Sequence, residues 1–214
     1  MPSIDTLINA FITLFVTIDP VGNIPLFLAL TAGMSATIRR SIALRGSMIA
    51  FVILAVFAIT GTVILDAIGI TVDAFRIAGG LLLFVMAFEM IYGRRQERRE
   101  EASNAAAIEH AANLAVFPLA LPLLAGPGTI SATILLSSQM TQGDGISAWA
   151  GSAVLIAIIA AMMILTGALL TLADVLDKYI STTVKLVLTR LLGVLLAALS
   201  VQYIADGVLA FSRH

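Results

Sequence analysis

Cysteine is absent from the 214-residue sequence, and histidine occurs only twice, at His110 and His214. Without cysteine there is no disulfide, no thiolate nucleophile and no cysteine-ligated metal. Both histidines lie outside the long apolar segments, so the sequence offers no membrane-embedded catalytic base or metal set. Charge is also scarce, and 12 Lys and Arg nearly balance 13 Asp and Glu. These absences argue against an enzyme, a bound metal or cofactor, and a nucleic-acid partner.

Apolar residues are what the sequence has in abundance. Hydrophobic residues make up 60% of the chain and charged residues 12%, and the mean hydropathy is +1.06. Soluble domains are typically about 45–50% apolar. We therefore predict an integral membrane protein that is surrounded by a lipid bilayer. The apolar runs lack the alternation of barrel strands, so helices are expected to satisfy the backbone in lipid.

Six apolar stretches are long enough to cross a hydrocarbon core of roughly 30 Å, which takes about 20 helical residues. They are Ile4–Ala32, Ser47–Ile68, Ile70–Tyr92, Leu114–Ser138, Ile146–Leu172 and Thr183–Phe211. The predicted fold is thus all-α, a polytopic membrane protein with six transmembrane helices.

Positive charge between the stretches predicts their orientation, because cytoplasmic connections are enriched in Lys and Arg. The basic residues in or beside every second connection are Arg39, Arg40, Arg45, Arg94, Arg95, Arg98, Arg99, Lys178 and Lys185. The opposite connections contain no Lys or Arg. We therefore predict a multi-pass protein of the cell inner (plasma) membrane with both termini on the periplasmic or extracellular side.

The chain contains two similar halves. FRIAGGLLLFVMAFEMIYG in the third stretch aligns with TRLLGVLLAALSVQYIADG in the sixth. The aligned pairs are Arg76 with Arg190, Gly79 with Gly193, and Gly93 with Gly207. We predict a first three-helix repeat over residues 1–93, a charged cytoplasmic linker over 94–113 and a second three-helix repeat over 114–214. Because each repeat has an odd number of spans, the second lies inverted in the membrane, as in many secondary transporters.

Proline and glycine interrupt the first stretch of each half, in IDPVGNIPLF and in LLAGPGTISATILL. Proline removes a backbone donor and glycine tolerates unwound backbone, so we expect the first helix of each repeat to break at this Pro/Gly motif. Matched breaks suit a central solute cavity, although such residues also simply bend membrane helices. The predicted solute-binding residues are Asp19, Pro20, Gly22, Asn23, Pro25, Gly126, Pro127, Gly128, Thr129 and Ser131.

Charged residues within the stretches are further candidates, because ionisable groups inside a membrane are by default functional. They are Asp19, Glu89, Arg76 and Arg190. The two acids can titrate and are candidate carriers of a coupling proton, although Glu89 held by a partner arginine is an equal alternative. The two arginines are placed symmetrically in the repeats, which favours a structural role at the repeat interface over binding a solute carboxylate.

The motifs DPVGNIPLF and PLALPLLAGPGTI, together with RIAGGLLLF, resemble those of the MarC family of bacterial and archaeal inner-membrane proteins, also called the small neutral amino-acid transporter (NAAT) family. The resemblance covers essentially the whole chain. It implies six membrane helices and transport of small neutral amino acids such as glycine and alanine.

Together these features predict a secondary transporter of small neutral amino acids that works by alternating access. The chain has no ATP-binding loop, so a gradient of H⁺ or Na⁺, or of the solute itself, would drive it. A channel, an exporter of another small solute and a purely structural protein are the alternatives. The partners expected are a small-molecule solute and the lipid bilayer, and the sequence leaves the oligomeric state open.

Overall fold

The structure is a computed structural model that describes residues 3–94, 114–141 and 148–212. The helices within these ranges are α1 (Ile4–Ile18), α2 (Asn23–Leu30), α3 (Ala36–Ala67), α4 (Val72–Ile91), the π-helical η1 (Ala115–Leu124), α6 (Pro127–Thr141), α7 (Ala148–Thr171), α8 (Ala173–Tyr179) and α9 (Thr182–Phe211). No strand occurs in these ranges, which confirms the all-helical prediction for them. Apart from Arg94, the predicted linker over 94–113 lies outside the described residues.

Four helices, α3, α4, α7 and α9, are long and apolar enough to cross a membrane. The count rises to six if the bent pairs α1–α2 and η1–α6 each form one span. The predicted second span, Ser47–Ile68, coincides with most of α3, but the helix itself begins earlier, at Ala36. Its first turns carry arginines, which a hydropathy profile excludes from a span although arginine favours helix. The structure also adds α8 in the connection before the last span.

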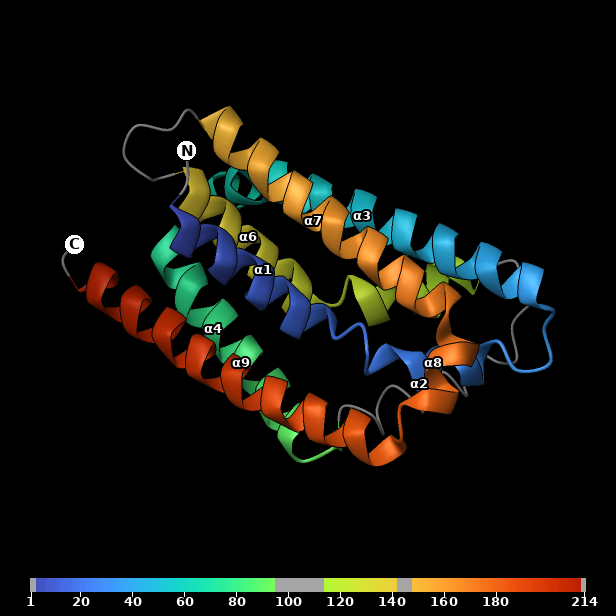
Figure 1. Ribbon diagram of the computed structural model, residues 1–214. Coiled ribbons are helices and arrows are strands. Elements are labelled where there is room, and N and C mark those ends of the chain that lie inside the picture. The colour runs from blue at the N-terminus through green and yellow to red at the C-terminus, as the bar shows by residue number, and fades with distance from the viewer. Residues whose placement is uncertain (1–2, 95–113, 142–147, 213–214) are drawn as a thin grey trace.

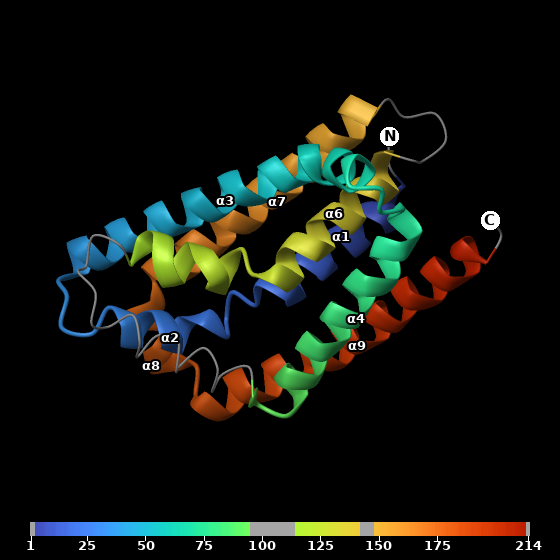
Figure 2. The same cartoon turned by 180° about the vertical axis from the view of Figure 1, so that it is seen from behind.

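The helices form a bundle in which most neighbours run antiparallel. α1 packs beside α6, α3 beside α7, and α4 beside α9. Figure 1 shows both termini at one end of this bundle. The short helices α2 and α8 and the π-helix η1 lie toward the other end, as Figure 2 shows from behind.

Hydroxyl side chains mark where several helices begin. Ser3, Ser35, Thr71 and Ser181 precede α1, α3, α4 and α9, and each side-chain oxygen accepts a hydrogen bond from an amide in the first turn. An N-cap of this kind satisfies one of the amides that a helix start leaves unpaired. The ends of the bundle are therefore defined by local sequence as well as by packing.

Glycine lets α4 and α9 lie close together. A Cβ atom added at Gly80 would lie 3.0 Å from the carbonyl oxygen of Ser200, and one added at Gly193 would lie 3.1 Å from that of Ala87. Gly207 contacts α4 in the same way further along the pair. Small residues allow membrane helices to approach this closely, because lipid provides little hydrophobic drive for their association.

Basic side chains gather toward one end of the bundle, and Arg76, beside Asp73 in the first turns of α4, is an exception at the other end. The end that holds α8 and the start of α3 carries Arg39, Arg40, Arg45, Arg94, Lys178 and Lys185. The end that holds both termini carries Asp5, Asp66, Asp73 and Asp206. Two ion pairs involve α8: Asp174 with Arg39 of α3, and Asp177 with Lys185 of α9. The long middle sections present exposed aliphatic and aromatic residues, as a lipid-facing surface requires.

Candidate solute-binding site at two helix breaks

The chain changes direction sharply at two places, and both contain predicted site residues. α1 and α2 are bent by 40° across residues 19–22, and η1 and α6 are bent by 59° across residues 125–126. The two interruptions lie next to each other in the middle of the bundle in both views (Figures 1 and 2). Segments separated by more than a hundred positions in the sequence therefore meet at one place.

Asp19 forms the end of α1. Its backbone is left-handed, with φ 53° and ψ 63°, a conformation that Asp tolerates better than most residues because its short side chain bonds locally. The carboxylate Oδ1 accepts a hydrogen bond of 3.1 Å from the amide of Gly22. A Cβ atom added at Gly22 would lie 2.2 Å from Oδ2 of Asp19, so a side chain at position 22 would force the carboxylate to move. Asp19 thus closes the turn through Pro20 that leads into α2.

Asn23 is the first residue of α2 and bridges the break. Its Nδ2 donates a hydrogen bond of 2.8 Å to the carbonyl oxygen of Ile18, which is one of the carbonyls left unpaired at the end of α1. Its Oδ1 is buried and has no hydrogen-bond partner among the described residues. Such a group costs free energy unless a donor reaches it. Pro25 follows in the first turn of α2, where a helix tolerates proline.

The second break follows an unusual segment. η1 has extended backbone at Phe117 and Leu121, and its hydrogen bonds include one from the amide of Ala125 to the carbonyl of Ala120 at 2.9 Å. Gly126 lies against this segment, because an added Cβ atom would lie 2.5 Å from the carbonyl oxygen of Pro122. The close approach of backbone explains why glycine occupies this position.

α6 starts at Pro127, the helix position that proline favours. The first backbone hydrogen bond runs from the amide of Ile130 to the carbonyl of Gly126 at 2.9 Å. The amides of Gly128 and Thr129 therefore have no acceptor within α6. These two donors and the positive end of the helix dipole lie at the break.

One hydrogen bond joins the two breaks directly. Oγ1 of Thr129 donates to the carbonyl oxygen of Thr17 at 3.5 Å, and both side chains are buried. Thr17 is not among the predicted residues, and no sequence signal identifies it, because its role depends on a main-chain carbonyl rather than on its side chain.

Gly128 and Ser131 face another element, α4. A Cβ atom added at Gly128 would lie 2.7 Å from Sδ of Met86, and the Cβ of Ser131 lies 3.7 Å from the Cβ position built at Gly79. The structure therefore divides the predicted set. Asp19, Asn23 and Thr129 lie at the junction of the breaks, whereas Gly128 and Ser131 pack α6 against α4.

The junction is closed in this conformation. Asp19 and Asn23 are 1% exposed, and Thr129 is 2% exposed. Two hollows lie elsewhere, one between α3 and α7 and one between α1 and α7, and neither is lined by the predicted break residues. A solute could reach the junction only if helices moved apart.

The other candidate charges lie on α4 and α9. Arg76 pairs with Asp73 at 3.4 Å within the first turns of α4, and its Nε has no partner among the described residues. Glu89 is half-buried in the last turn of α4, and Arg190 is exposed on α9. Within the described ranges, no three His, Cys, Asp or Glu residues are grouped so as to hold a metal ion.

Comparison with known proteins shows extensive similarity. The family model described as "MarC family integral membrane protein" matches residues 4–211. A UPF0056 membrane protein of Archaeoglobus fulgidus is 35% identical over 208 residues, covering 93% of this chain and 90% of the relative. The UPF0056 membrane protein YhcE of Escherichia coli is 36% identical over 198 residues, covering 92% and 89%. YvbG of Bacillus subtilis, which carries the same description, is 33% identical over 206 residues, covering 94% and 93%. No solved structure matches the chain.

Proposed function

Because the chain belongs to the MarC family of integral membrane proteins, we propose that it is a secondary transporter of small neutral amino acids such as glycine or alanine. It is not an enzyme on this proposal, and it moves its solute by alternating access. The observation that carries the proposal is the meeting of two interrupted helices at a buried junction. Transporters place interrupted helices at the midplane, where freed backbone groups bind the solute.

The groups at the junction suit the two charges of an amino acid. The unpaired amides of Gly128 and Thr129, at the positive end of α6, favour a carboxylate. The free Oδ1 of Asn23 and the carbonyl of Thr17 are acceptors for an ammonium group. The family resemblance, rather than any open cavity at the closed junction, is what favours glycine and alanine over larger amino acids.

The pairing of helices supports two inverted repeats. Under the predicted division, α3 and α7 are the second helices of the two repeats, and α4 and α9 are the third. Each packs beside its counterpart, and α1 packs beside α6. Two similar halves related in this way can exchange exposure of a central site between the two faces. The first helix of each repeat is then one span, broken at the Pro/Gly motif.

The separation of charge supports the orientation. The basic end of the bundle faces the cytoplasm, and both termini face the periplasmic or extracellular side of the inner membrane. Asp19, at the first break, is the candidate carrier of a coupling proton, and the freed carbonyls are the alternative ligands for Na⁺. Arg76 and Arg190 are structural charges on this proposal, and Glu89 is a second candidate for proton coupling.

Uptake of labelled glycine and alanine into proteoliposomes tests the proposal, with imposed gradients of H⁺ or Na⁺. We expect saturable uptake that one gradient accelerates. Asn23→Ala and Thr129→Ala should each lower uptake about tenfold or more, because a hydrogen bond to a charged group is worth about 1.5–3 kcal/mol.

Thr166→Ala is the matched control. Thr166 is also a fully buried threonine, but its Oγ1 donates to the carbonyl of Met162 within its own helix α7 at 2.8 Å. The Thr166→Ala variant should take up glycine and alanine as fast as the unmodified protein does. Flux that does not saturate would indicate a channel. Absence of uptake of both amino acids under every gradient, with folded protein in the vesicles, would contradict amino-acid transport.

A further inference from the structure

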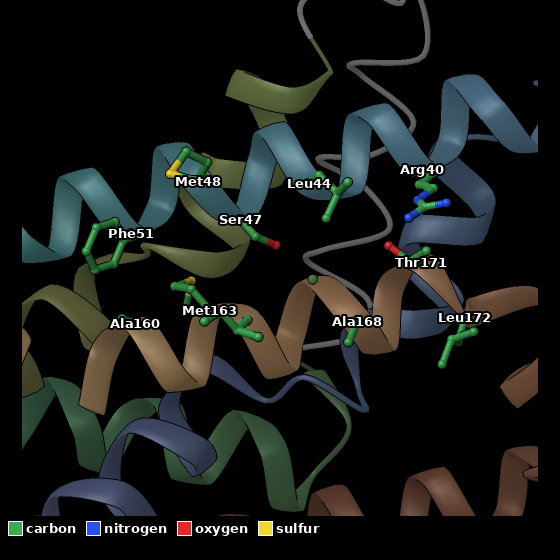
Figure 3. Close-up of a pocket in the computed structure, with 12 residues that line it drawn as sticks. Arg40, Leu44, Ser47, Met48, Phe51, Ala160, Met163, Ala168, Thr171 and Leu172 are labelled. Carbon is green, nitrogen blue, oxygen red and sulfur yellow. The ribbon is translucent and has the colours of Figure 1, made fainter. Parts of the chain in front are cut away.

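A groove lies between α3 and α7, away from the helix breaks (Figure 3). Its volume is about 520 Å³. One face of each helix lines it: Arg40, Leu44, Ser47, Met48 and Phe51 from α3, and Ala160, Met163, Ile164, Gly167, Ala168, Thr171 and Leu172 from α7. Small residues on α7 create the hollow. Leu44, Met48 and Ile164 are at least half exposed, so the groove opens toward the surrounding lipid.

The groove has the length of one leaflet. α3 and α7 run antiparallel, with Arg40 near Thr171 at one end and Phe51 near Ala160 at the other (Figure 3). At 1.5 Å per residue, α3 rises about 16 Å between Arg40 and Phe51. Half of a hydrocarbon core of about 30 Å is about 15 Å. The groove, which starts at the basic end of the bundle, is therefore about as long as the apolar half of one leaflet is thick.

The polar groups of the groove lie mainly at its basic end. Arg40 is exposed and makes no hydrogen bond or ion pair with any residue in the described ranges, whereas its neighbour Arg39 is paired with Asp174. Oγ1 of Thr171 has no hydrogen-bond partner in the same ranges. Deeper in the groove the lining is apolar except for Ser47, whose Oγ is also without a partner among the described residues. Among the described residues, Arg40 is thus a positive charge without an ionic partner at one end of a mainly apolar groove.

We propose that this groove binds one anionic phospholipid of the surrounding leaflet. The phosphate lies at the guanidinium of Arg40, the glycerol ester region lies at the Thr171 hydroxyl, and one acyl chain runs past Met48 and Met163 to Phe51. A guanidinium binds phosphate through paired hydrogen bonds, and a basic residue at the membrane surface favours anionic lipid. The proposal is independent of the solute that the helix breaks bind.

A single tryptophan placed in the groove tests the proposal. The chain has one tryptophan, Trp149, so Trp149→Phe with Phe51→Trp leaves a reporter at the deep end of the groove. The full-length purified protein is titrated in detergent with phosphatidylglycerol or phosphatidylcholine, each brominated on the acyl chains, and the quenching of Trp emission is measured. Phosphatidylglycerol should quench at about fivefold lower concentration than phosphatidylcholine, since one basic residue contributes about that factor.

Two variant pairs make the result specific. Arg40→Gln should remove the headgroup preference, whereas Arg45→Gln, an exposed arginine of the same helix outside the groove, should retain it. Ala168→Phe fills the groove and should abolish quenching, whereas Ala153→Phe, on the exposed face of α7 outside the groove, should not.

Three results would overturn the proposal. Equal quenching by the two lipids would show that the groove does not prefer an anionic headgroup. Equal loss of the preference in the Arg40→Gln and Arg45→Gln variants would show that Arg40 has no specific role and that the preference reflects general attraction of the basic surface for anionic lipid. The third result is that neither lipid quenches the reporter. If the protein also has the mass of a dimer, and Ala168→Phe dissociates that dimer, a second copy of the chain occupies the groove instead of a lipid.

Discussion

Oγ1 of Thr129 donates a hydrogen bond of 3.5 Å to the carbonyl oxygen of Thr17, and this contact joins the start of α6 to the end of α1. Both groups are buried at the place where two helices are interrupted. Because the bond is long and therefore weak, a polar solute could replace it at little cost. Under the proposed function, this is the contact that a bound solute replaces when the junction opens.

The turn between α1 and α2 depends on glycine at position 22. Gly22→Ala should lower the free energy of unfolding by about 1–3 kcal/mol, because the new Cβ would lie within 2.2 Å of the Asp19 carboxylate. The apparent Tm in detergent measures the loss. In a protein that already carries Asp19→Gly, Gly22→Ala should lower the free energy of unfolding much less, because the carboxylate that would clash is absent. The effects of the two substitutions on stability are therefore expected not to add. Equal costs in both backgrounds would show that the clash does not determine the choice of glycine.

Close packing of α4 on α9 should be sensitive to side-chain size at Gly193. A Cβ there would lie 2.9 Å from the Cβ of Met90, so Gly193→Leu should force the helices apart and destabilise the protein by about 1–3 kcal/mol or more. Val194→Leu, which enlarges an exposed neighbour on the same helix, is the control and should leave the apparent Tm unchanged. A similar apparent Tm for Gly193→Leu and Val194→Leu would mean that α9 does not pack closely against α4 at Gly193.

Several features of the fold were predictable from sequence because they follow from local chemistry. Hydropathy indicates membrane helices, and proline with glycine at 20, 22, 126 and 127 lies where α1 ends and α6 starts. The start of α3 and the presence of α8 were missed, because both lie in charged segments that a hydropathy profile assigns to connections.

The geometry of the site was less predictable for a different reason. The choice of Asn23 and Thr129 depended only on their positions after the two motifs, and the structure places both at the junction. Thr17 contributes a backbone carbonyl, which any residue type would supply, so no side-chain pattern could identify it. That Ser131 faces α4 rather than α1 depends on how the helices pack, which the repeat alignment does not specify.

The ion pair between Arg39 and Asp174 ties α3 to α8 at the basic end of the bundle. A double-mutant cycle with Arg39→Gln and Asp174→Asn should give a coupling energy of up to about 1 kcal/mol, because Asp174 is half exposed to solvent. High salt should reduce this coupling. The same cycle with Arg40→Gln in place of Arg39→Gln should give none, and coupling of equal size in both cycles would contradict a specific pair.

Access to the junction from both sides of the membrane is the most direct test of alternating access. The chain has no cysteine, so Ala125→Cys provides a single reactive thiol at the second break without removing a predicted solute-binding side chain. Membrane-impermeant thiol reagents are applied to either face of oriented vesicles, with and without glycine or alanine, and Ser200→Cys, equally buried on α9, is the control. We predict that Cys at position 125 reacts from both faces and that solute slows the reaction, while the control does not react. Reaction from one face only, or none from either in a protein that still takes up solute, would contradict a central site at the paired breaks.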